Sequence, residues 1–488
     1  MAPTRRRFFG QAALVAGGVA GATGVGGRIA AAQGGIDPAA LDALRGRLQG
    51  RLVVPGDETF DRDRRVFYTN PRTETKPAVI VQCGHADDVP RAVEFARRYG
   101  LELAVRSGGH SHLAWGSSGG LVIDLAPLRR IAVDPARRIV TVDGGVLGGD
   151  VAVAAGKHGL APVLGQCPGV GAAGVTLGGG LGWLSGLFGA CCDSLLSASI
   201  VTADGSSVEA DAARDPDLLW GLQGAGANFG VATSLTARLH PLGPVIGGDI
   251  HYAPRDARDV LRGFRDVMHA AADALQATLN LTRGDRGLFI SFCHAGSEAD
   301  AERLLETLRT IARPTKEAVT RQDYAALATK AAATASPASA AAAFRSIEAV
   351  YRDRVSDEVI DIFVDRLASA PVDAIFGLSH YMHGAVCRVA PDATAFPHRR
   401  AHSIHLRVAC QWADPTETER RFAWTDEWRR LCRPTSDETI YANYQTYSTE
   451  RGGAAIFATN HDRLARLKAR LDPDNVFHRN ANVTPARG

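Results

Sequence analysis

The chain has 488 residues, of which 45% are hydrophobic and 22% charged, the balance of a soluble globular protein too long for one simple core. Its 55 basic and 52 acidic residues nearly cancel, so the composition gives no basic stripe for binding nucleic acid. The eight cysteines form neither a C-x-x-C pair nor a spaced set of metal ligands. Composition therefore predicts two or three structural units, with no nucleic-acid partner and no bound metal.

The first 32 residues are typical of a targeting segment. They begin T-R-R-R-F-F-G at Thr4 and continue through a weakly apolar Ala/Gly/Val stretch that ends at Ala32. This resembles a twin-arginine signal with Arg5 and Arg6 as the pair, and it implies a secreted or periplasmic protein. The apolar stretch is too short and glycine-rich for a stable membrane span. Loss of its four arginines would change the formal charge from +3 to −1. A disordered basic tail is the alternative.

The next hundred residues predict a small α+β lobe. We expect a helix over 38–48, a connecting segment over 59–70, a strand over 78–83, a helix over 87–98 with Asp87 as its N-cap, and a strand over 102–106. The lobe ends in the loop R-S-G-G-H-S, Arg106–Ser111. Two glycines let a backbone approach a ligand closely, and bare amides beside Arg106 suit a diphosphate. An ordinary turn with a surface histidine is the alternative.

A second lobe is predicted from about Leu121 to Leu242. Its expected strands cover 121–124, 139–142, 200–203 and 231–239, and a glycine-rich run lies between Gly165 and Gly182. That run contains G-V-G-A-A-G, formally a dinucleotide fingerprint, with Asp193 about twenty residues beyond it. The fingerprint should close a buried strand, but a proline precedes it directly and denies a ladder hydrogen bond. We therefore expect no nicotinamide site.

The composition changes near Gly243. From there to Pro434 the glycine clusters vanish, and we expect helices to dominate, including an alanine-rich stretch over 324–344 broken at Pro337, before a strand over 402–412. The last segment carries Y-A-N-Y-Q-T-Y at 441–447 and an amphipathic helix over 461–471 stopped by Pro473.

Five segments together resemble the FAD-linked oxidases of the berberine bridge enzyme family, within the vanillyl-alcohol oxidase type of flavoprotein. They are the histidine loop, the glycine-rich run, the tryptophan and glycine run over 218–230, the stretch 384–399 and the D-P-x-N-x-F turn over 472–477. The resemblance implies an α+β fold: a two-lobed PCMH-type FAD-binding domain plus an α+β substrate-binding domain. The expected division is a signal over 1–32, the FAD domain over 33–242, the substrate domain over 243–434 and a segment over 435–488 that completes the FAD domain.

The resemblance also implies how the flavin is held. His110 matches the residue that bonds the 8α-methyl group, and Cys167, 57 residues further on, matches the residue that bonds ring carbon 6 in bicovalent members. Inert packing is the alternative for a buried cysteine. The implied cofactor-binding set is Arg106, Ser107, Gly108, Gly109, His110, Ser111, Gly165, Cys167, Val170, Gly171, Gly174, Gly178, Gly179, Gly180, Gly182, Val201, Asn228, Phe229, Gly230, Tyr441 and Asn443.

The same resemblance implies the catalytic residues. The motif Y-x-N-Y matches an active-site strand in which Tyr444 acts as base and Tyr441 as its partner, with an arginine or histidine of the substrate domain expected to depress the pKa. Val170 matches a position where valine accompanies oxidase behaviour. Two residues depart from the family pattern: Gln445 replaces a common aspartate, and His383 replaces a usual glycine, where it narrows the substrate pocket or is core.

The implied activity is that of an exported FAD oxidase. It would take a hydride from an alcohol or amine carbon of a sugar, an oligosaccharide or a bulky natural product, and molecular oxygen would receive the electrons as H2O2. A dehydrogenase with another electron acceptor is the nearest alternative. An exported binding protein that keeps the fold without turnover is the alternative from a different class.

Overall fold

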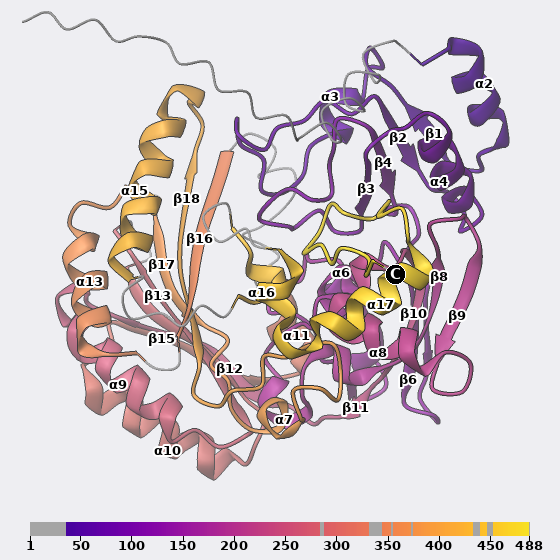
Figure 1. The fold of residues 1–488 in the computed structure, drawn as a ribbon. Coiled ribbons are helices and arrows are strands. Elements are labelled where there is room, and N and C mark those ends of the chain that lie inside the picture. The colour runs from indigo at the N-terminus through magenta and orange to yellow at the C-terminus, as the bar shows by residue number, and fades with distance from the viewer. Residues whose placement is uncertain are drawn as a thin grey trace, which may run out of the picture.

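The computed structural model of the protein describes residues 36–283, 287–330, 344–352, 355–371, 374–432, 440–446 and 452–487. Within these residues, no helix is long and apolar enough to cross a membrane. A four-stranded, a five-stranded and a seven-stranded sheet form the main parts of the molecule, and a further sheet has two strands (Figure 1). The expected signal over 1–32 and the expected break at Pro337 lie outside the described residues.

The first lobe is a four-stranded sheet covered by two helices. Its elements are α2 (Pro38–Arg47), β1 (Arg51–Val53), α3 (Phe60–Asp63), β2 (Val79–Gln82), α4 (Asp88–Arg98), β3 (Leu103–Arg106) and β4 (Leu121–Asp124), and the strand order is β1-β2-β4-β3. Strand β4 pairs in parallel with both β2 and β3. The prediction that residues from Leu121 onward begin the second lobe is therefore wrong, because β4 is the centre of the first sheet.

Asp87 is the N-cap residue of α4, as the sequence predicts. Asp87 makes no side-chain cap hydrogen bond to α4. The carboxylate of Asp88 is fully buried instead and accepts hydrogen bonds from the amides of Gln49, Gly50 and Gly84. Asp88 thus connects the start of α4 to the ends of two strands.

The second lobe is a five-stranded sheet in the order β5-β6-β10-β8-β9. Its elements are β5 (Ile131–Asp134), β6 (Ile139–Asp143), α5 (Gly148–Gly156), β7 (Leu160–Ala161), α6 (Ala172–Leu177), α7 (Ser185–Phe188), η2 (Cys191–Ser194), β8 (Leu195–Val201), β9 (Ser207–Asp211), α8 (Pro216–Ala225), η3 (Gly226–Asn228), β10 (Val231–Arg238) and β11 (His240–Pro241). The third strand was expected over 200–203, but β8 ends at Val201. The short strands β7 and β11 pair separately.

A seven-stranded antiparallel sheet forms the centre of the region 243–434, which also contains helices as expected. The sequence predicted only one of these strands, over 402–412. The strand order is β15-β12-β14-β13-β17-β18-β16. The elements are β12 (Val245–Tyr252), α9 (Ala257–His269), β13 (Leu275–Thr282), β14 (Leu288–His294), α10 (Glu298–Ile311), β15 (Lys316–Gln322), α11 (Tyr324–Thr329), β16 (Phe344–Arg352), α13 (Asp357–Leu367), β17 (Ile375–Ser379), α14 (Ala385–Arg388), β18 (Ile404–Trp412) and α15 (Thr418–Cys432). Most of these strands were not predicted, because several of them are rich in polar residues.

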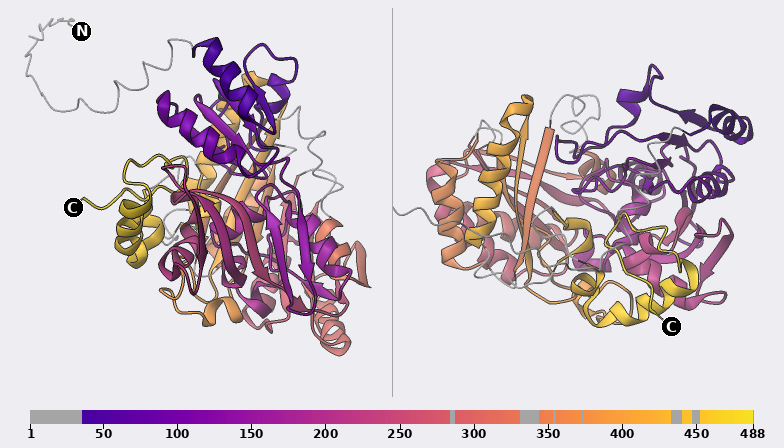
Figure 2. Two further views of the ribbon diagram at one scale, coloured as in Figure 1. Left: turned by 90° about the vertical axis from the view of Figure 1, so that its right-hand side faces the viewer. Right: turned by 45° about the horizontal axis from the view of Figure 1, so that its top comes forward.

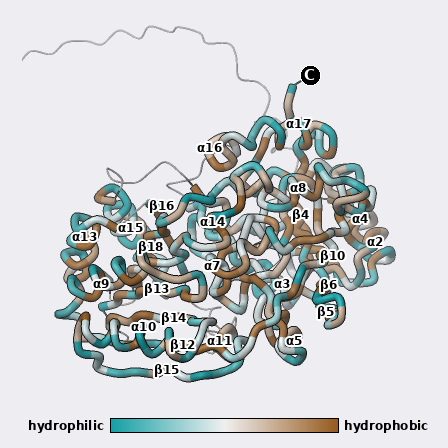
Figure 3. Tube along the Cα trace, turned by 90° about the horizontal axis from the view of Figure 1, so that it is seen from below, coloured by the Kyte–Doolittle hydropathy of each residue, from teal (hydrophilic) through white to brown (hydrophobic). Residues whose placement is uncertain are grey.

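The two faces of this sheet differ. Alternate residues such as Leu279, Leu378 and Leu406 pack with α9, α13 and α15 in one apolar core, and these helices form the outer layer in Figure 1. The opposite face carries polar side chains, among them Asn280 and Arg407. The edge strand β15 is hydrophilic along most of its length (Figure 3). A strand alternates its side chains between two faces, so one sheet provides both a core and a polar wall.

The C-terminal segment packs on the second lobe. It contains η8 (Ala442–Tyr444), α16 (Gly453–Phe457) and α17 (His461–Leu471), the last with the bounds expected from the sequence. Leu464 and Leu467 of α17 pack in the core of the second lobe, and the yellow C-terminal helix lies beside this lobe in Figure 2. At the end of α17 the fully buried ammonium of Lys468 donates to Asp472 and to the carbonyl oxygens of Asn228 and Phe477.

Candidate active site

The histidine loop leaves β3 at the edge of the first lobe. Gly109 has φ +67°, a conformation that glycine adopts without strain, and its carbonyl oxygen accepts from the amide of Phe67 at 3.0 Å. The ring of His110 stacks on Phe67 with centroids 4.1 Å apart. Burial, followed by the charge of Arg345, lowers the pKa of His110 to about 4. His110 is therefore a neutral imidazole at neutral pH, with a ring nitrogen that can act as a nucleophile.

The glycine-rich run packs directly against this loop. A Cβ on Gly108 would lie 2.2 Å from the amide nitrogen of Gly171, and a Cβ on Gly169 would lie 3.3 Å from Nε2 of His110. The loop is fixed from the other side, because the Ser107 hydroxyl donates to the Gly144 carbonyl at 2.6 Å. Gly169 follows Cys167 by two residues. The fold thus brings His110 and the turn that carries Cys167 together, although 57 residues separate the two anchors in the sequence.

Arg106 does not have the role that was expected. Its guanidinium is buried, pairs with Asp124 at 2.8 Å and donates to the carbonyl oxygens of Asp63 and Arg65. It holds the loop to the neighbouring strand β4 and is not available to a diphosphate. The expected donors that stay available are the backbone amides of 107–111, which donate no hydrogen bond within the described part of the chain.

These residues fit the FAD that the resemblance implies. Consecutive amides with no partner form a concave site for an anion such as the diphosphate. The neutral His110 ring and the half-buried Cys167 thiol are both adjacent to the same turn. Burial raises the pKa of Cys167, while the amides of Gly169 and Val170 and the charge of Arg407 act in the opposite direction. The donor set would hold the diphosphate at the loop and the ring edge at His110 and Cys167.

The other glycines of the run mostly allow close packing of the chain on itself. A Cβ on Gly178 would lie 2.0 Å from Oδ1 of Asn443, one on Gly179 would lie 2.5 Å from the ring of Phe396, and one on Gly180 would lie 2.3 Å from Sγ of Cys191. Gly182 and Gly230 are equally close to backbone carbonyl oxygens. Gly174 has nothing within 4 Å of the added Cβ, and Gly165 has only Val175. In the histidine loop, the carbonyl oxygen of Ser111 accepts a hydrogen bond from the amide of Ala114.

Asn228, Phe229 and Val201 lie deeper than was expected. Asn228 donates to the carbonyl oxygens of Ala225 and Ala481 and accepts from the amide of Val483, so its side chain fixes the C-terminal segment. Phe229 is fully buried in the core of the second lobe, and Val201 packs in the core of the first. The structure gives these three side chains packing contacts and hydrogen bonds to protein.

The two tyrosines lie on a single turn. The expectation of a strand at the Y-x-N-Y motif is wrong, because Ala442–Tyr444 form the 3-10 turn η8. The Tyr441 hydroxyl accepts from the Gly180 amide at 2.8 Å and from Nδ2 of Asn443 at 2.9 Å. The Tyr444 hydroxyl shares a 2.7 Å hydrogen bond with Nε2 of His380. Tyr441 therefore fixes the turn to the glycine-rich run, and Tyr444 reaches the substrate domain.

Sequence reasoning missed the residues that surround Tyr444. The ring of His405 stacks on Tyr444 with centroids 4.7 Å apart, His112 meets its edge at 5.2 Å, and Tyr68 meets the edge of His112 at 4.7 Å. A signal was present: His405 and Arg407 alternate with leucine and valine along β18, as in a strand with one polar face. His112 follows His110 by two residues in the same loop.

Burial keeps the histidine and tyrosine side chains around this site neutral. It lowers the pKa of both His112 and His380 to about 3, and it lowers the pKa of His405 well below its usual range. It also raises the pKa of Tyr444, although Arg407 and the Ser379 hydroxyl act in the opposite direction. The expected cation and histidine are therefore present beside Tyr444, but the net shift of its pKa is upward, opposite to the expected depression.

The two departures from the family pattern are both buried. Gln445 follows the turn and is 2% exposed. His383 packs against α7, where a Cβ on Gly186 would lie 2.8 Å from its Cε1. Burial lowers the pKa of His383, and the charge of Asp273 acts in the opposite direction. The ring of His383 thus fills the space beside α7.

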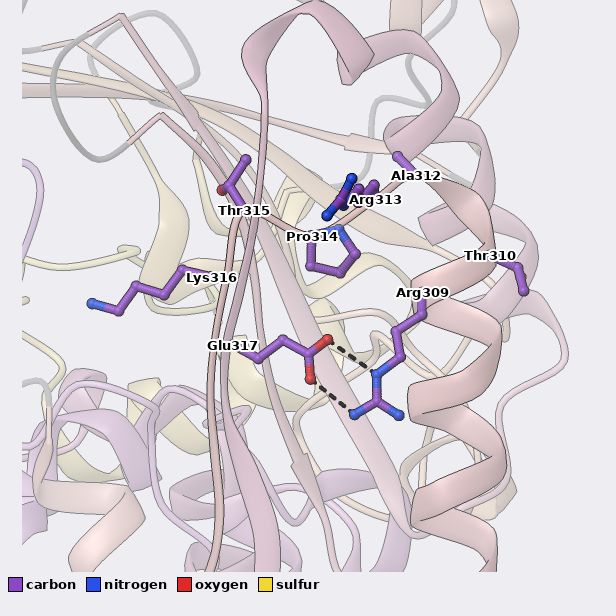
Figure 4. Close-up of a pocket in the computed structure, with 8 residues that line it drawn as sticks. All are labelled: Arg309, Thr310, Ala312, Arg313, Pro314, Thr315, Lys316 and Glu317. Atoms are coloured by element: carbon purple, nitrogen blue, oxygen red, sulfur yellow. Dashed lines mark hydrogen bonds and ion pairs between the residues drawn. The ribbon is translucent and has the colours of Figure 1, made fainter.

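A surface pocket lies at the other edge of the large sheet. It is lined by the residues that connect α10 to β15, Arg309, Thr310, Ala312, Arg313, Pro314, Thr315, Lys316 and Glu317 (Figure 4). Strand β15 is the far edge of the sheet from β18 and β16. The pocket contains none of the site residues above, and Arg309 in it is already paired with Glu302 and Glu317.

Two family models match the chain. Residues 77–211 match the FAD binding domain, and residues 440–484 match the family described as berberine and berberine like. The first match contains the histidine loop and Cys167. The second contains the turn with Tyr441 and Tyr444.

Relatives and solved structures match nearly the whole chain. It is 27% identical to (R)-6-hydroxynicotine oxidase of Paenarthrobacter nicotinovorans, covering 90% of this chain and 97% of that one, and 28% identical to carbohydrate oxidase of Microdochium nivale, covering 93% and 98%. The crystal structure of 6-hydroxy-D-nicotine oxidase from Arthrobacter nicotinovorans superposes with a TM-score of 0.81 at 26% identity, covering 90% and 98%. Xylooligosaccharide oxidase from Myceliophthora thermophila gives 0.81 at 22% identity, covering 92% and 100%, and so shares the fold.

The fold and the site thus define a FAD-linked oxidoreductase with a PCMH-type flavin domain. The resemblance to the berberine bridge enzyme-like FAD-linked oxidases is confirmed, because the chain matches the FAD binding domain model and the berberine and berberine like model, and its relatives include proteins named as FAD-linked oxidoreductases and oxidases. Its α+β fold is confirmed.

Proposed function

We propose that this enzyme oxidises an alcohol or amine carbon of a sugar, an oligosaccharide or a bulky natural product, with molecular oxygen as the electron acceptor and H2O2 as the product. One observation carries the proposal: segments that are far apart in sequence place His110, the Cys167 turn and Tyr444 around one buried site. Relatives named as a nicotine oxidase and a carbohydrate oxidase support both an amine and an alcohol substrate.

Each residue of the site has a defined task in this proposal. When bound, FAD would supply the hydride acceptor and the means of passing the electrons to oxygen. The phenolate form of Tyr444, produced when its hydroxyl proton leaves to solvent, accepts the proton of the substrate hydroxyl or amine at its phenolic oxygen. His380 is neutral at neutral pH and orients that oxygen through the 2.7 Å hydrogen bond. Tyr441, held by Gly180 and Asn443, fixes the position of the turn.

The proposal includes two covalent links to the flavin, from His110 to the 8α-methyl group and from Cys167 to ring carbon 6. Their nearness to one turn supports both links. After acid precipitation the flavin should remain with the protein, and mass spectrometry should find it on peptides that contain both residues. His110→Ala should still retain flavin, and the His110→Ala/Cys167→Ala variant should release it. Free FAD from the precipitated wild type would contradict the two links.

Export by the twin-arginine pathway is a separate part of the proposal. It depends on Arg5 and Arg6, since this transport reads the arginine pair specifically. Replacing both by lysine should keep the precursor in the cytoplasm. Cell fractionation measures this, and normal export of the double variant would contradict the assignment.

Purified protein tests the activity directly. A yellow protein whose flavin is reduced by substrate without oxygen is an enzyme, and a protein that binds substrate but never reduces its flavin is the binding protein of the alternative. Peroxide formed in step with substrate oxidation identifies an oxidase. Fast flavin reduction with slow reoxidation by oxygen would instead identify a dehydrogenase.

A further inference from the structure

Arg407 lies across the polar face of the large sheet. On β18 it is opposite Gly377 of β17 and Ala349 of β16. Its side chain passes over Gly377, where a Cβ would lie 2.8 Å from Nε, and Nη2 donates to Oδ1 of Asn280 on β13 at 2.9 Å. Gly377 therefore leaves a path on which the guanidinium extends over β17 to β13.

No acid of the described part of the chain pairs with Arg407. Its one hydrogen bond within the described residues is to the neutral amide oxygen of Asn280, and no described carboxylate is within ion-pair distance of it. Arg407 is also only partly exposed. An arginine has five N–H donors, and arginines withdrawn from water are normally paired. Four donors of Arg407 thus remain for a ligand.

Arg407 is two residues from His405 on the same face of β18, and the ring of His405 stacks on Tyr444 in the active site. The charge of Arg407 acts on Tyr68, His112, His380, Tyr444 and Cys167, which come from the flavin domain, the large sheet and the C-terminal turn. These groups are neutral at pH 7, because burial disfavours their charged forms. Arg407 is therefore an unbalanced full charge beside the proposed base.

The second arginine near the site is already engaged. Arg345 donates to the Phe67 carbonyl oxygen at 3.2 Å and its guanidinium lies over the Phe67 ring at 4.5 Å. Tyr444 does not need Arg407 as a hydrogen-bond partner, since His380 already has that position. Arg407, by contrast, makes one hydrogen bond within the described ranges, to the neutral Asn280 amide.

We propose that Arg407 binds a carboxylate of the substrate, so that the enzyme acts on an alcohol or amine that also carries a carboxylate group. This inference rests on the proposed function and narrows its substrate class. The guanidinium fork matches the two oxygens of a carboxylate and forms charge-assisted hydrogen bonds with them. A carboxylate at Arg407 would hold the substrate between the polar sheet face and Tyr444.

The first test is a binding measurement that needs no turnover. Benzoate and benzamide have the same ring and differ in charge, and their binding to the holoenzyme can be followed by the change in flavin absorbance and by thermal shift. Wild type should bind benzoate at least about 10-fold more tightly than benzamide, and Arg407→Gln should weaken benzoate binding by about 10- to 100-fold, the effect of losing a charge-assisted hydrogen bond. Arg407→Lys should lie between the two.

The chain offers a matched control and a second variant. Arg309→Gln removes an equal charge from the far edge of the same sheet, where two glutamates already balance it, and should bind benzoate as wild type does. Gly377→Ala keeps Arg407 but blocks the path of its side chain, so benzoate binding should weaken there too. Equal binding of benzoate and benzamide by wild type, or wild-type benzoate affinity in Arg407→Gln, would overturn the proposal.

The second test uses substrates in matched pairs. Glucuronate against glucose represents a sugar acid, and 4-(hydroxymethyl)benzoate against its amide represents an aromatic acid. The acid of at least one pair should have the higher kcat/KM, and Arg407→Gln should remove that preference mainly through KM. If Arg407→Gln lowered kcat equally for acid and neutral substrates, Arg407 would act on Tyr444 and the carboxylate assignment would be wrong. If no compound reduced the flavin, the proposed function would fail, while the benzoate measurement would still decide the role of Arg407.

Discussion

Replacing Tyr444 by phenylalanine isolates the hydroxyl that we propose as the base. The change removes one oxygen and the 2.7 Å hydrogen bond to His380, but it leaves the ring stacked on His405. The turn is held by Tyr441 and Asn443 through bonds that the change does not touch. Tyr444→Phe should therefore keep the flavin, its covalent links and its absorbance spectrum.

The expected loss is in the chemical step. General-base help is worth about 100- to 10,000-fold in rate, or about 3 to 5 kcal/mol of activation free energy. Burial raises the pKa of Tyr444, so the ionised form grows with pH above neutrality. In wild type the rate of flavin reduction should rise across the alkaline range, and in Tyr444→Phe this rise should disappear.

Anaerobic stopped-flow reduction at saturating substrate measures that step without interference from oxygen. Tyr252→Phe is a matched control, because Tyr252 is also buried in the large sheet but donates to the carbonyl oxygen of Leu308, away from the site. It should reduce at the wild-type rate. A wild-type rate in Tyr444→Phe together with a collapsed rate in Tyr441→Phe would exchange the two roles, and a normal rate in both would place the base elsewhere.

Three further predictions concern oxygen, stability and pH. Val170, partly exposed at the turn after Cys167, should control oxygen access, so stopped-flow reoxidation of Val170→Leu should be much slower than wild type; equal rates would remove the argument. Lys468→Met leaves the buried carboxylate of Asp472 unpaired and should cost about 3 to 5 kcal/mol in denaturant unfolding, part of which Lys468→Met/Asp472→Asn should restore. His112 and His380 have pKa values of about 3 in the folded protein and near 6.5 in the unfolded chain. As pH falls below about 6.5 the unfolded chain binds these protons first, so each residue should remove about 1.4 kcal/mol of stability per pH unit until about pH 3, and a flat unfolding free energy between pH 7 and 5 would contradict their burial as neutral rings.

Local patterns predicted much of the flavin domain. Alternating and continuous apolar runs located β2, β3, β4 and β10 to within a few residues, since burial requires the same periodicity in any fold that contains them. Helix α17 was found from its amphipathic pattern and Pro473. The pairing of β4 with the first lobe was missed, because parallel strands are joined by long connections and their order leaves no mark on either strand.

The large sheet shows why composition alone was insufficient. Its strands carry polar residues on one face, such as Asn280 on β13 and Arg407 on β18. Those residues lower the apparent hydrophobicity of each strand. The alternation of polar and apolar residues was visible along β18. Whether it marks a solvent-exposed face or a binding site depends on what covers the polar face.

The family resemblance, the FAD cofactor and the candidates His110, Cys167 and Tyr444 could be predicted from the sequence, because they depend on short motifs that are read along the chain. The contacts of each side chain depend on the tertiary fold and could not be predicted. The fold turned Arg106 toward Asp124, placed His380 at the Tyr444 hydroxyl and laid Arg407 across Gly377 without an acid beside it. Such contacts join segments tens to hundreds of residues apart, and their energies arise only when burial removes water from all partners at once.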